Sequence, residues 1–440
     1  MPLFYLVIAL NRHFTISMKR LTSSMPKSRV NIRQAVMLSV LFSMITALGA
    51  CSTSVIQTSL RPGNGVGGTN LLNYPKGYDF YKAPDGFHYA SPGTVVRLQF
   101  VGDASGYTTL RVMYHSTDSQ GKDALVTGLV TYPDAKPKIG KWPIISWDHG
   151  TIGMSQNCAP SRMGMGGIAP NLGIKAVYVA TDYLGLGIDG KIHPYLNRTI
   201  EANSTIDIVR AVQEIPDAHA GNAWVVVGDS QGGHAALATG EIAPKYAPEF
   251  SLKGVVAVAP GVLLGQTFQG DSPELIQLIE TMVVFGYKAS DPALNLGSIM
   301  TPAGLSLYST IKTGCVDQIA VAFIKAYQNS KGKIFRVPPL QTALGKAWLS
   351  LNNEPQVKTQ SPILVIGGGQ DAIAVPARID ALMPKLCELG DNASIGWYPT
   401  GGHGNELNLA LAQVKAWVLN RFAGKPVKPA CPYSPPTWLK

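Results

Sequence analysis

Residues 224–237 read W-V-V-V-G-D-S-Q-G-G-H-A-A-L. The four apolar residues at the start predict a fully buried parallel strand, and the small and apolar residues after Gln231 predict a helix that packs on the sheet. Between them lies the pattern G-x-S-x-G, in the strand-to-helix context that a nucleophile elbow requires. We expect a strained turn that exposes the Ser230 hydroxyl, with glycine required at Gly228 and Gly232 because a side chain there would meet backbone. The alternative is a glycine-rich turn with an unreactive serine.

Backbone groups near this serine are candidates for binding a negatively charged oxygen. Gln231 opens the predicted helix, where unpaired N–H donors and the positive end of the helix dipole favour a developing oxyanion. A second donor is expected from the loop after an earlier buried strand, which reads Asp148-His149-Gly150-Thr151. The H-G element of this loop resembles the oxyanion loop of many esterases. The alternative is a purely structural pairing of Asp148 with His149.

A serine hydroxyl is a poor nucleophile at neutral pH, so Ser230 needs a base, and the base needs a carboxylate that orients it. After a nucleophile elbow these partners follow in the chain order acid, then histidine. Of the eight histidines, only His403 lies beyond the last predicted strands, in a glycine-flanked loop. Asp371 comes directly after a predicted buried strand and is the expected acid. Asp380 and Asp391 are weaker candidates, because one falls in a predicted helix and the other in a turn.

Two further histidines lie near the motif or in a conspicuous turn. His234 follows Ser230 by one helical turn and is expected in the core, because an elbow serine points away from its own helix. No partner for His193 can be named from the sequence.

Strands and helices alternate along the wider chain, which is typical of an α/β fold. The strand-like stretches outside the elbow are residues 95–101, 110–115, 125–132, 143–147, 176–181, 254–260, 362–367 and 394–398. The first three predict an antiparallel opening, and the others predict a mostly parallel sheet flanked by helices. A final amphipathic helix carries Val414 and Val418 on its apolar face.

Five parts make up the expected domain organisation. They are a signal segment (1–50), an N-terminal extension (51–92), the first part of the α/β core (93–261), a helical cap insert (262–354) and the second part of the core with the tail (355–440). In the cap, apolar residues recur at helical spacing along two stripes that begin at Leu275 and Val316. A cap in this position would cover Ser230 and supply an apolar acyl pocket. The alternative is that the two stripes only pack against each other.

The N-terminal residues have the features of an export signal. A basic segment at 25–33 precedes an apolar run at 35–47, which is short for a membrane span. The run leads into L-G-A-C, ending at Cys51, which resembles the bacterial lipobox, where the cysteine is acylated and becomes the new N-terminus. We expect an exported lipoprotein of the bacterial cell envelope, held at a membrane by lipid on Cys51. Ser52 favours the outer membrane by resemblance to enterobacterial sorting. An ordinary cleavage site and a secreted protein are the alternatives.

The net charge of +10 would suit a nucleic-acid-binding protein, but its distribution argues against one. Six basic residues and no acidic residue fall within the first 50 positions, and 31 basic against 27 acidic residues remain after them. No basic stripe interleaved with aromatic residues is present, so we expect no nucleic-acid partner.

Cysteine usage fits an oxidising compartment. Beside Cys51 the chain has Cys158, Cys315, Cys387 and Cys431, enough for two disulfides with three possible connectivities. We favour Cys158–Cys315 and Cys387–Cys431, the second of which would attach the proline-rich tail to the body. No C-x-x-C or H-E-x-x-H pattern occurs, so no metal site is expected.

Several motifs together resemble one family. They are Gly150-Thr with Cys158-Ala-Pro-Ser, Thr181-Asp-Tyr-Leu-Gly-Leu-Gly, His193-Pro-Tyr-Leu and the elbow itself with its following G-H-A. They are similar to the secretory lipase family (lipase A type) of the α/β-hydrolase superfamily, and the similarity covers most of residues 90 to 420. The resemblance implies an α/β-hydrolase fold with a cap, and activity on carboxylic esters.

Residue by residue, the resemblance implies a triad of Ser230, Asp371 and His403, with Gln231 at the oxyanion position. Asp148 matches the aspartate that begins the oxyanion loop of lipase A-type fungal enzymes. The following His149-Gly150 departs from that fungal pattern, which leaves the second oxyanion donor open. The lipoprotein signal also separates this chain from the soluble fungal members.

The expected function is therefore a serine carboxylester hydrolase, of the triacylglycerol lipase or carboxylesterase type. It would act through an acyl-enzyme on an ester with an apolar acyl group and would need no cofactor. A serine peptidase or amidase is the alternative, because the same triad serves both. A non-catalytic, membrane-tethered binding protein is a weaker alternative, because such scaffolds usually lose a triad residue.

Overall fold

The computed structural model describes residues 79–86, 88–163, 172–188, 190–268 and 273–439. The expected signal segment (1–50) and Cys51 lie outside the described residues, as does most of the expected extension (51–92). Within the described ranges, no helix combines the length and the apolar character that a bilayer crossing needs.

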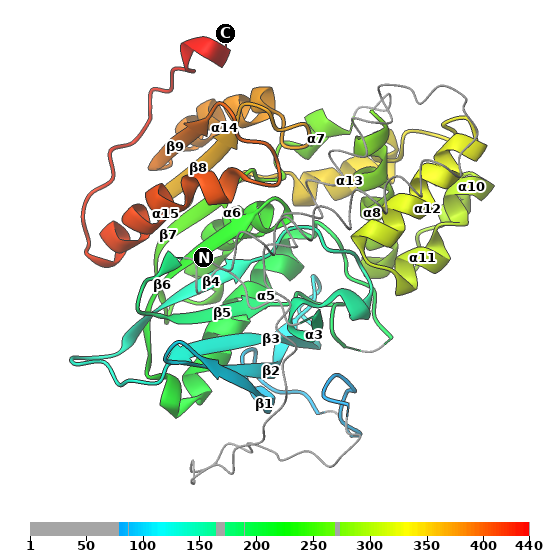
Figure 1. Cartoon of the computed structure of the whole chain (residues 1–440). Coiled ribbons are helices and arrows are strands. Elements are labelled where there is room, and N and C mark those ends of the chain that lie inside the picture. Colours follow the sequence, from blue (N-terminus) through cyan, green and yellow to red (C-terminus); the bar gives the residue numbers. More distant parts are fainter. Residues whose placement is uncertain (1–78, 87, 164–171, 189, 269–272, 440) are drawn as a thin grey trace, which may run out of the picture. The chain divides into compact units, whose positions relative to one another are not determined.

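A mixed sheet is the centre of the fold (Figure 1). Its strands are β1 (Val95–Ala104), β2 (Tyr107–Thr117), β3 (Asp123–Pro133), β4 (Trp142–Asp148), β5 (Val177–Thr181), β6 (Ala220–Asp229), β7 (Ser251–Val258), β8 (Ile363–Gly368) and β9 (Ala393–Tyr398). The spatial order is β1-β2-β3-β5-β4-β6-β7-β8-β9. The pairs β1–β2, β2–β3 and β3–β5 are antiparallel, and all pairs from β5–β4 to β8–β9 are parallel. The predicted antiparallel opening and parallel body are both confirmed.

The middle strands are apolar on both faces, which places them inside the core. Trp224, Val225, Val226 and Val227 of β6 are all fully buried. Helices cover both faces of a parallel sheet, so such a strand has no solvent side and alternation disappears from its sequence.

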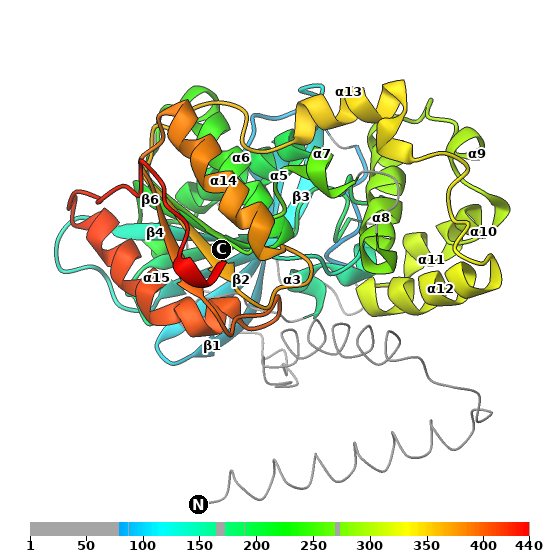
Figure 2. The same ribbon diagram turned by 90° about the horizontal axis from the view of Figure 1, so that it is seen from above.

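Four longer helices pack around the sheet (Figures 1 and 2). They are α5 (Arg198–Ala211), α6 (Gln231–Tyr246), α14 (Pro376–Leu389) and α15 (Glu406–Phe422). Helices α5 and α6 contact each other extensively, α6 packs on β6 and β7, and α15 lies against β7, β8 and β9. The apolar stripe predicted for the final helix is confirmed, because Val414 and Val418 are fully buried.

Between β7 and β8 the described residues form seven α-helices, which we call the helical insert. They are α7 (Leu264–Thr267), α8 (Glu274–Ser290), α9 (Leu296–Ile299), α10 (Pro302–Leu305), α11 (Tyr308–Thr313), α12 (Val316–Asn329) and α13 (Ala343–Asn352). Figure 2 shows α8 to α12 gathered on the side away from α15. Leu278 and Met282 of one predicted stripe are buried, as are Ile319 and Phe323 of the other.

Two disulfides link distant segments, with the pairing favoured from the sequence. Cys158–Cys315 joins a 3-10 turn after β4 to the residue that precedes α12. Cys387–Cys431 joins α14 to the C-terminal tail. The tail is held further by Ala430 N–H, which donates to Ala393 O of β9 at 2.7 Å.

Candidate active site

Ser230 stands between β6 and α6 in a strained conformation, with φ 58° and ψ −114°. For a residue with a side chain, such an angle persists only where the surroundings enforce it. A Cβ on Gly228 would lie 1.9 Å from Gly232 O, and one on Gly232 would lie 1.9 Å from Asp148 O. The predicted requirement for two glycines is therefore confirmed, since neither position has room for a side chain.

His403 and Asp371 approach Ser230 from two other loops. His403 lies between β9 and α15, and its Nε2 is 2.8 Å from Ser230 Oγ. Its Nδ1 is 2.8 Å from Oδ2 of Asp371, which follows β8. Asp371 Oδ1 accepts from the backbone N–H groups of Ile373 (2.7 Å) and Ala374 (2.9 Å). Three side chains that are far apart in sequence thus form one line of hydrogen bonds.

Electrostatics in this line favour a charged carboxylate beside an imidazole that attracts a proton. Burial alone would raise the pKa of Asp371, but His403 and the hydrogen bonds outweigh it and lower that pKa. Burial alone would lower the pKa of His403, but the Asp371 carboxylate outweighs it and raises that pKa. An imidazole whose proton affinity is raised is a stronger base toward the Ser230 hydroxyl.

The two weaker acid candidates are occupied elsewhere. Asp380 accepts a hydrogen bond from the hydroxyl of Tyr433 at 2.8 Å. Asp391 accepts one from the backbone N–H of Thr359 at 2.7 Å. Neither contacts the imidazole of His403 in the structure.

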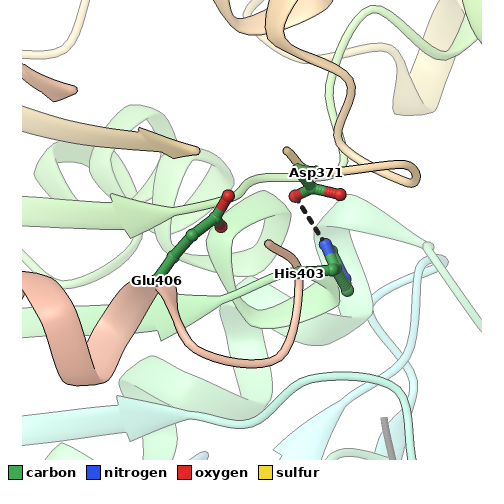
Figure 3. A group of neighbouring side chains, drawn as sticks. All are labelled: Asp371, His403 and Glu406. Carbon is green, nitrogen blue, oxygen red and sulfur yellow. Dashed lines mark hydrogen bonds and ion pairs between the residues drawn. The ribbon is translucent and has the colours of Figure 1, made fainter. Parts of the chain in front are cut away.

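A further carboxyl group, Glu406, lies beside this line at the first residue of α15 (Figure 3). It is 1% exposed, and neither of its carboxyl oxygens has a hydrogen-bond partner among the described residues. Burial, followed by the charge of Asp371, raises its pKa to about 9. Burial also raises the pKa of Asp229, next to the serine, to about 6. At neutral pH Glu406 is therefore protonated and uncharged, so no second negative charge is buried beside Asp371.

Asp371, His403 and Glu406 each place one ligand atom within 4.8 Å of the others, which is close enough to hold a metal ion. Both ring nitrogens of His403 are already engaged, one by Asp371 and the other by Ser230. A metal at this point would therefore displace the hydrogen bonds of the line.

Asp148 and His149 are both buried, and they do not pair with each other. Asp148 Oδ1 accepts from the hydroxyl of Thr205 at 2.8 Å, and Oδ2 has no partner among the described residues. The His149 Nδ1 faces Gly150 O at 2.7 Å, and burial lowers the pKa of His149 to about 4. Both side chains thus shape the loop, and neither faces the serine through a hydrogen bond.

The backbone of this loop passes directly beside the serine. A Cβ on Gly150 would lie 3.5 Å from Ser230 Cβ. Thr151 Oγ1 lies 2.6 Å from the hydroxyl of Tyr195, which holds the end of the loop. Gln231 is the first residue of α6, so its backbone N–H is at the position expected of an oxyanion donor.

Behind the elbow lies a buried polar cluster around Glu201 of α5. Glu201 Oε1 accepts from Gln231 Nε2 at 2.7 Å, and the same amide nitrogen is 2.7 Å from His193 Nε2. Glu201 Oε2 is 2.8 Å from His234 Nδ1, and His234 Nε2 is 2.9 Å from Asn352 O. Both nitrogens of His234 face acceptors, so this imidazole carries two protons and a positive charge. The cluster ties the elbow helix to α5 and to the end of the insert.

The pKa values in the cluster agree with a charged pair. Burial would raise the pKa of Glu201, but hydrogen bonds from His193 and His234 outweigh it and lower that pKa to about 2. Burial would lower the pKa of His234, but Glu201 outweighs it and raises that pKa. The expectation that His234 is a core histidine is confirmed, and His193 does have partners.

A small cavity of about 40 Å³, partly open to solvent, lies beside Ser230 and His403. Its walls are mostly apolar, and the helical insert contributes Phe268, Ile276 and Ile279. The insert thus contributes part of the cavity wall beside the serine.

Comparison with known proteins comes first from sequence. The profile of the secretory lipase family matches residues 161–429, more than half of the chain. Lipase 6 of Candida albicans is 23% identical over 82% of this chain and 85% of its own length. A protein of Mycobacterium tuberculosis described as a probable inactive lipase is 24% identical over 80% of this chain and 83% of its own length.

A solved structure resembles the fold as well. The X-ray structure of Candida antarctica lipase A has a TM-score of 0.68 with 17% identity, over 83% of this chain and 90% of that chain. At 17% identity, this similarity establishes a shared fold and nothing further about this chain.

Proposed function

The chain belongs to the secretory lipase family and has the α/β-hydrolase fold, and from this premise we propose that it is a serine carboxylester hydrolase with Ser230 as nucleophile. The observation that carries the proposal is the unbroken pair of 2.8 Å contacts from Ser230 Oγ to His403 and from His403 to Asp371. An imidazole held between a hydroxyl and a carboxylate is the arrangement that activates a serine.

In the proposed reaction, Ser230 Oγ attacks the acyl carbonyl while His403 Nε2 takes the hydroxyl proton. Asp371 keeps the imidazole in the tautomer that leaves Nε2 free and stabilises the imidazolium that forms. The carbonyl oxygen becomes an oxyanion, which accepts from the N–H of Gln231 and from the backbone of the loop that begins at Asp148. His403 then protonates the leaving alcohol. In the second half of the reaction, His403 takes a proton from a water molecule that attacks the acyl-enzyme, and it returns a proton to Ser230 Oγ as the acid leaves.

The mainly apolar cavity beside Ser230 supports an ester with an apolar acyl group. A peptidase that recognises an amino terminus would need carboxylates in the same place. Of the acidic residues in the described part of the insert, neither Glu274 nor Glu280 lines the cavity. Glu280 is buried within the insert, and burial raises its pKa to about 7.

Covalent trapping tests the nucleophile and the reaction class together. With an organophosphate that releases p-nitrophenol, we expect one adduct per chain, found on the peptide that contains Ser230. Turnover of p-nitrophenyl esters, from acetate to palmitate, is expected to stop as the adduct forms. An adduct on another residue would contradict the proposal. Turnover of aminoacyl anilides in preference to esters would favour a peptidase. The absence of both adduct and turnover would favour a non-catalytic binding protein; one relative is described as a probable inactive lipase.

We also propose export and attachment to a membrane through lipid on Cys51, supported by the L-G-A-C sequence that ends there. Cys51→Ser is expected to move the protein from the membrane fraction to the soluble fraction of an expressing bacterium, since no acyl chain can then be added. Ser54→Ala, which leaves the cysteine in place, serves as the control. Equal membrane retention of both variants would contradict the anchor.

A further inference from the structure

The cavity beside Ser230 contains one feature that an ordinary fatty acyl pocket does not need. Apart from His403, the described residues that line it include one with a basic or acidic side chain, and that residue is Arg378. The rest of the wall is apolar or uncharged, including Leu264, Phe268 and Ile279. A guanidinium therefore shares a mostly apolar cavity with the reactive serine.

Arg378 lies in the first turn of α14 and is only partly exposed. Its Nη1 donates to Ile373 O at 2.9 Å. Among the described residues, its side chain forms this one hydrogen bond. A guanidinium has five N–H donors, so most of its donors remain for a ligand or water. No carboxylate of the described residues forms an ion pair with it within 4.0 Å.

Burial without a paired anion has an energetic consequence. Partial burial lowers the pKa of Arg378, and the more distant charge of Asp371 offsets this only in part. Arginine stays charged in proteins, so this cation is partly desolvated, and an anionic ligand would offset the cost of that desolvation. The flat fork of donors matches a carboxylate with two parallel hydrogen bonds, which are stronger than those between neutral groups.

We propose that Arg378 is a specificity-determining residue that selects esters whose acyl chain ends in a carboxylate, that is, half-esters of dicarboxylic acids. The inference rests on the proposed ester hydrolysis at Ser230. The apolar walls hold the methylene chain, Ser230 attacks the esterified end, and the guanidinium binds the free carboxylate.

The test compares two substrates that differ only in charge: the mono-p-nitrophenyl ester of suberic acid, and the same compound with its free carboxylate methylated. Arg378→Met removes the charge and keeps an apolar side chain of similar length. We expect this variant to lower kcat/KM for the anionic ester by about tenfold or more, the discrimination given by a charged hydrogen bond. For the neutral ester, kcat/KM should change less than about twofold, because this substrate has no carboxylate for the guanidinium to bind and its other contacts are kept. Adipate and sebacate analogues show which chain length reaches the guanidinium.

Two controls separate this role from others. Lys385→Met removes a positive charge from the same helix at an exposed position, where Lys385 pairs with Glu388, and should leave the preference unchanged. The preference of the wild-type protein should weaken in high salt, because the contact is ionic.

A loss of equal size for both esters, together with a shifted acidic limb of the pH profile, would overturn the inference, because Arg378 would then act on Asp371. Unchanged kinetics with both esters would overturn it too, while leaving the proposed hydrolysis intact. If the wild-type protein hydrolyses neither ester, the proposed function itself fails and the inference falls with it.

Discussion

Ser230→Ala is expected to lower kcat for p-nitrophenyl esters by about 10⁴-fold to 10⁶-fold, because the variant has no atom that can form the acyl-enzyme. The oxyanion donors and the cavity remain, so a residual rate above that in water is expected. KM should change little, since the hydroxyl contributes to the reaction more than to binding. Steady-state kinetics on the purified variant, with active sites of the wild type counted by burst titration, measures the effect.

Ser350→Ala is a suitable control, because this exposed serine of α13 donates only to Ala347 O. It should retain the activity of the wild type. If Ser230→Ala kept more than about a tenth of the wild-type kcat, Ser230 would not be the nucleophile, because replacing a triad nucleophile lowers kcat by a far larger factor.

Glu201→Gln is expected to destabilise the fold by about 3–5 kcal/mol near pH 6, which is typical when one partner of a buried ion pair is removed. The amide has the same shape but no charge, so His234 loses its buried counter-ion. Both side chains of this pair are fully buried, so water cannot replace the lost interaction. Urea unfolding of both proteins measures the difference in the free energy of unfolding.

The pH dependence of this difference follows from the two pKa shifts. Glu201 has a lowered pKa in the folded state, so its contribution is full above 4.5 and disappears as the pH falls toward about 2. His234 has a raised pKa, so its contribution is full below 6.5 and disappears as the pH rises through the folded-state value. The destabilisation should therefore be largest between about pH 4.5 and 6.5.

Glu388→Gln on α14 is the matched control, since Glu388 forms an exposed pair with Lys385. Its effect should stay below about 1 kcal/mol. A Glu201→Gln variant as stable as this control, at every pH, would show that the cluster does not hold the elbow helix in place.

The elbow and its partners could be predicted because backbone sterics and chain order constrain them. A serine in a G-x-S-x-G between a buried strand and a helix can adopt few conformations other than the elbow. His403 and Asp371 could be identified because each lies in a loop directly after one of the last two predicted strands. The two apolar stripes of the insert predicted helices, and they coincide with α8 and α12. The short helices α9, α10 and α11 span four to six residues, which is too little for a helical period to show.

The Glu201 cluster could not be predicted, because Gln231 and His234 lie 30 and 33 residues after Glu201, and Asn352 lies 118 residues after His234. Charged residues are seldom fully buried, so a glutamate in a helix is first interpreted as a surface residue. One signal was available. The sequence of α5 places polar residues on every side of the helix, so no separate solvent face can be distinguished, and five of its eight polar residues are buried in the structure. The roles of Glu406 and Arg378 likewise depend on neighbours that only the folded chain brings close.

The Cys158–Cys315 disulfide, finally, closes a ring of backbone that contains Ser230 and much of the helical insert. A protease that cuts the chain once anywhere inside this ring produces two fragments that stay covalently joined. Outside a reducing environment, a single nick therefore cannot by itself release either fragment, and the serine stays linked to both. If the protein is exported as proposed, this covalent ring would keep a nicked chain in one piece, independently of the stability of the fold.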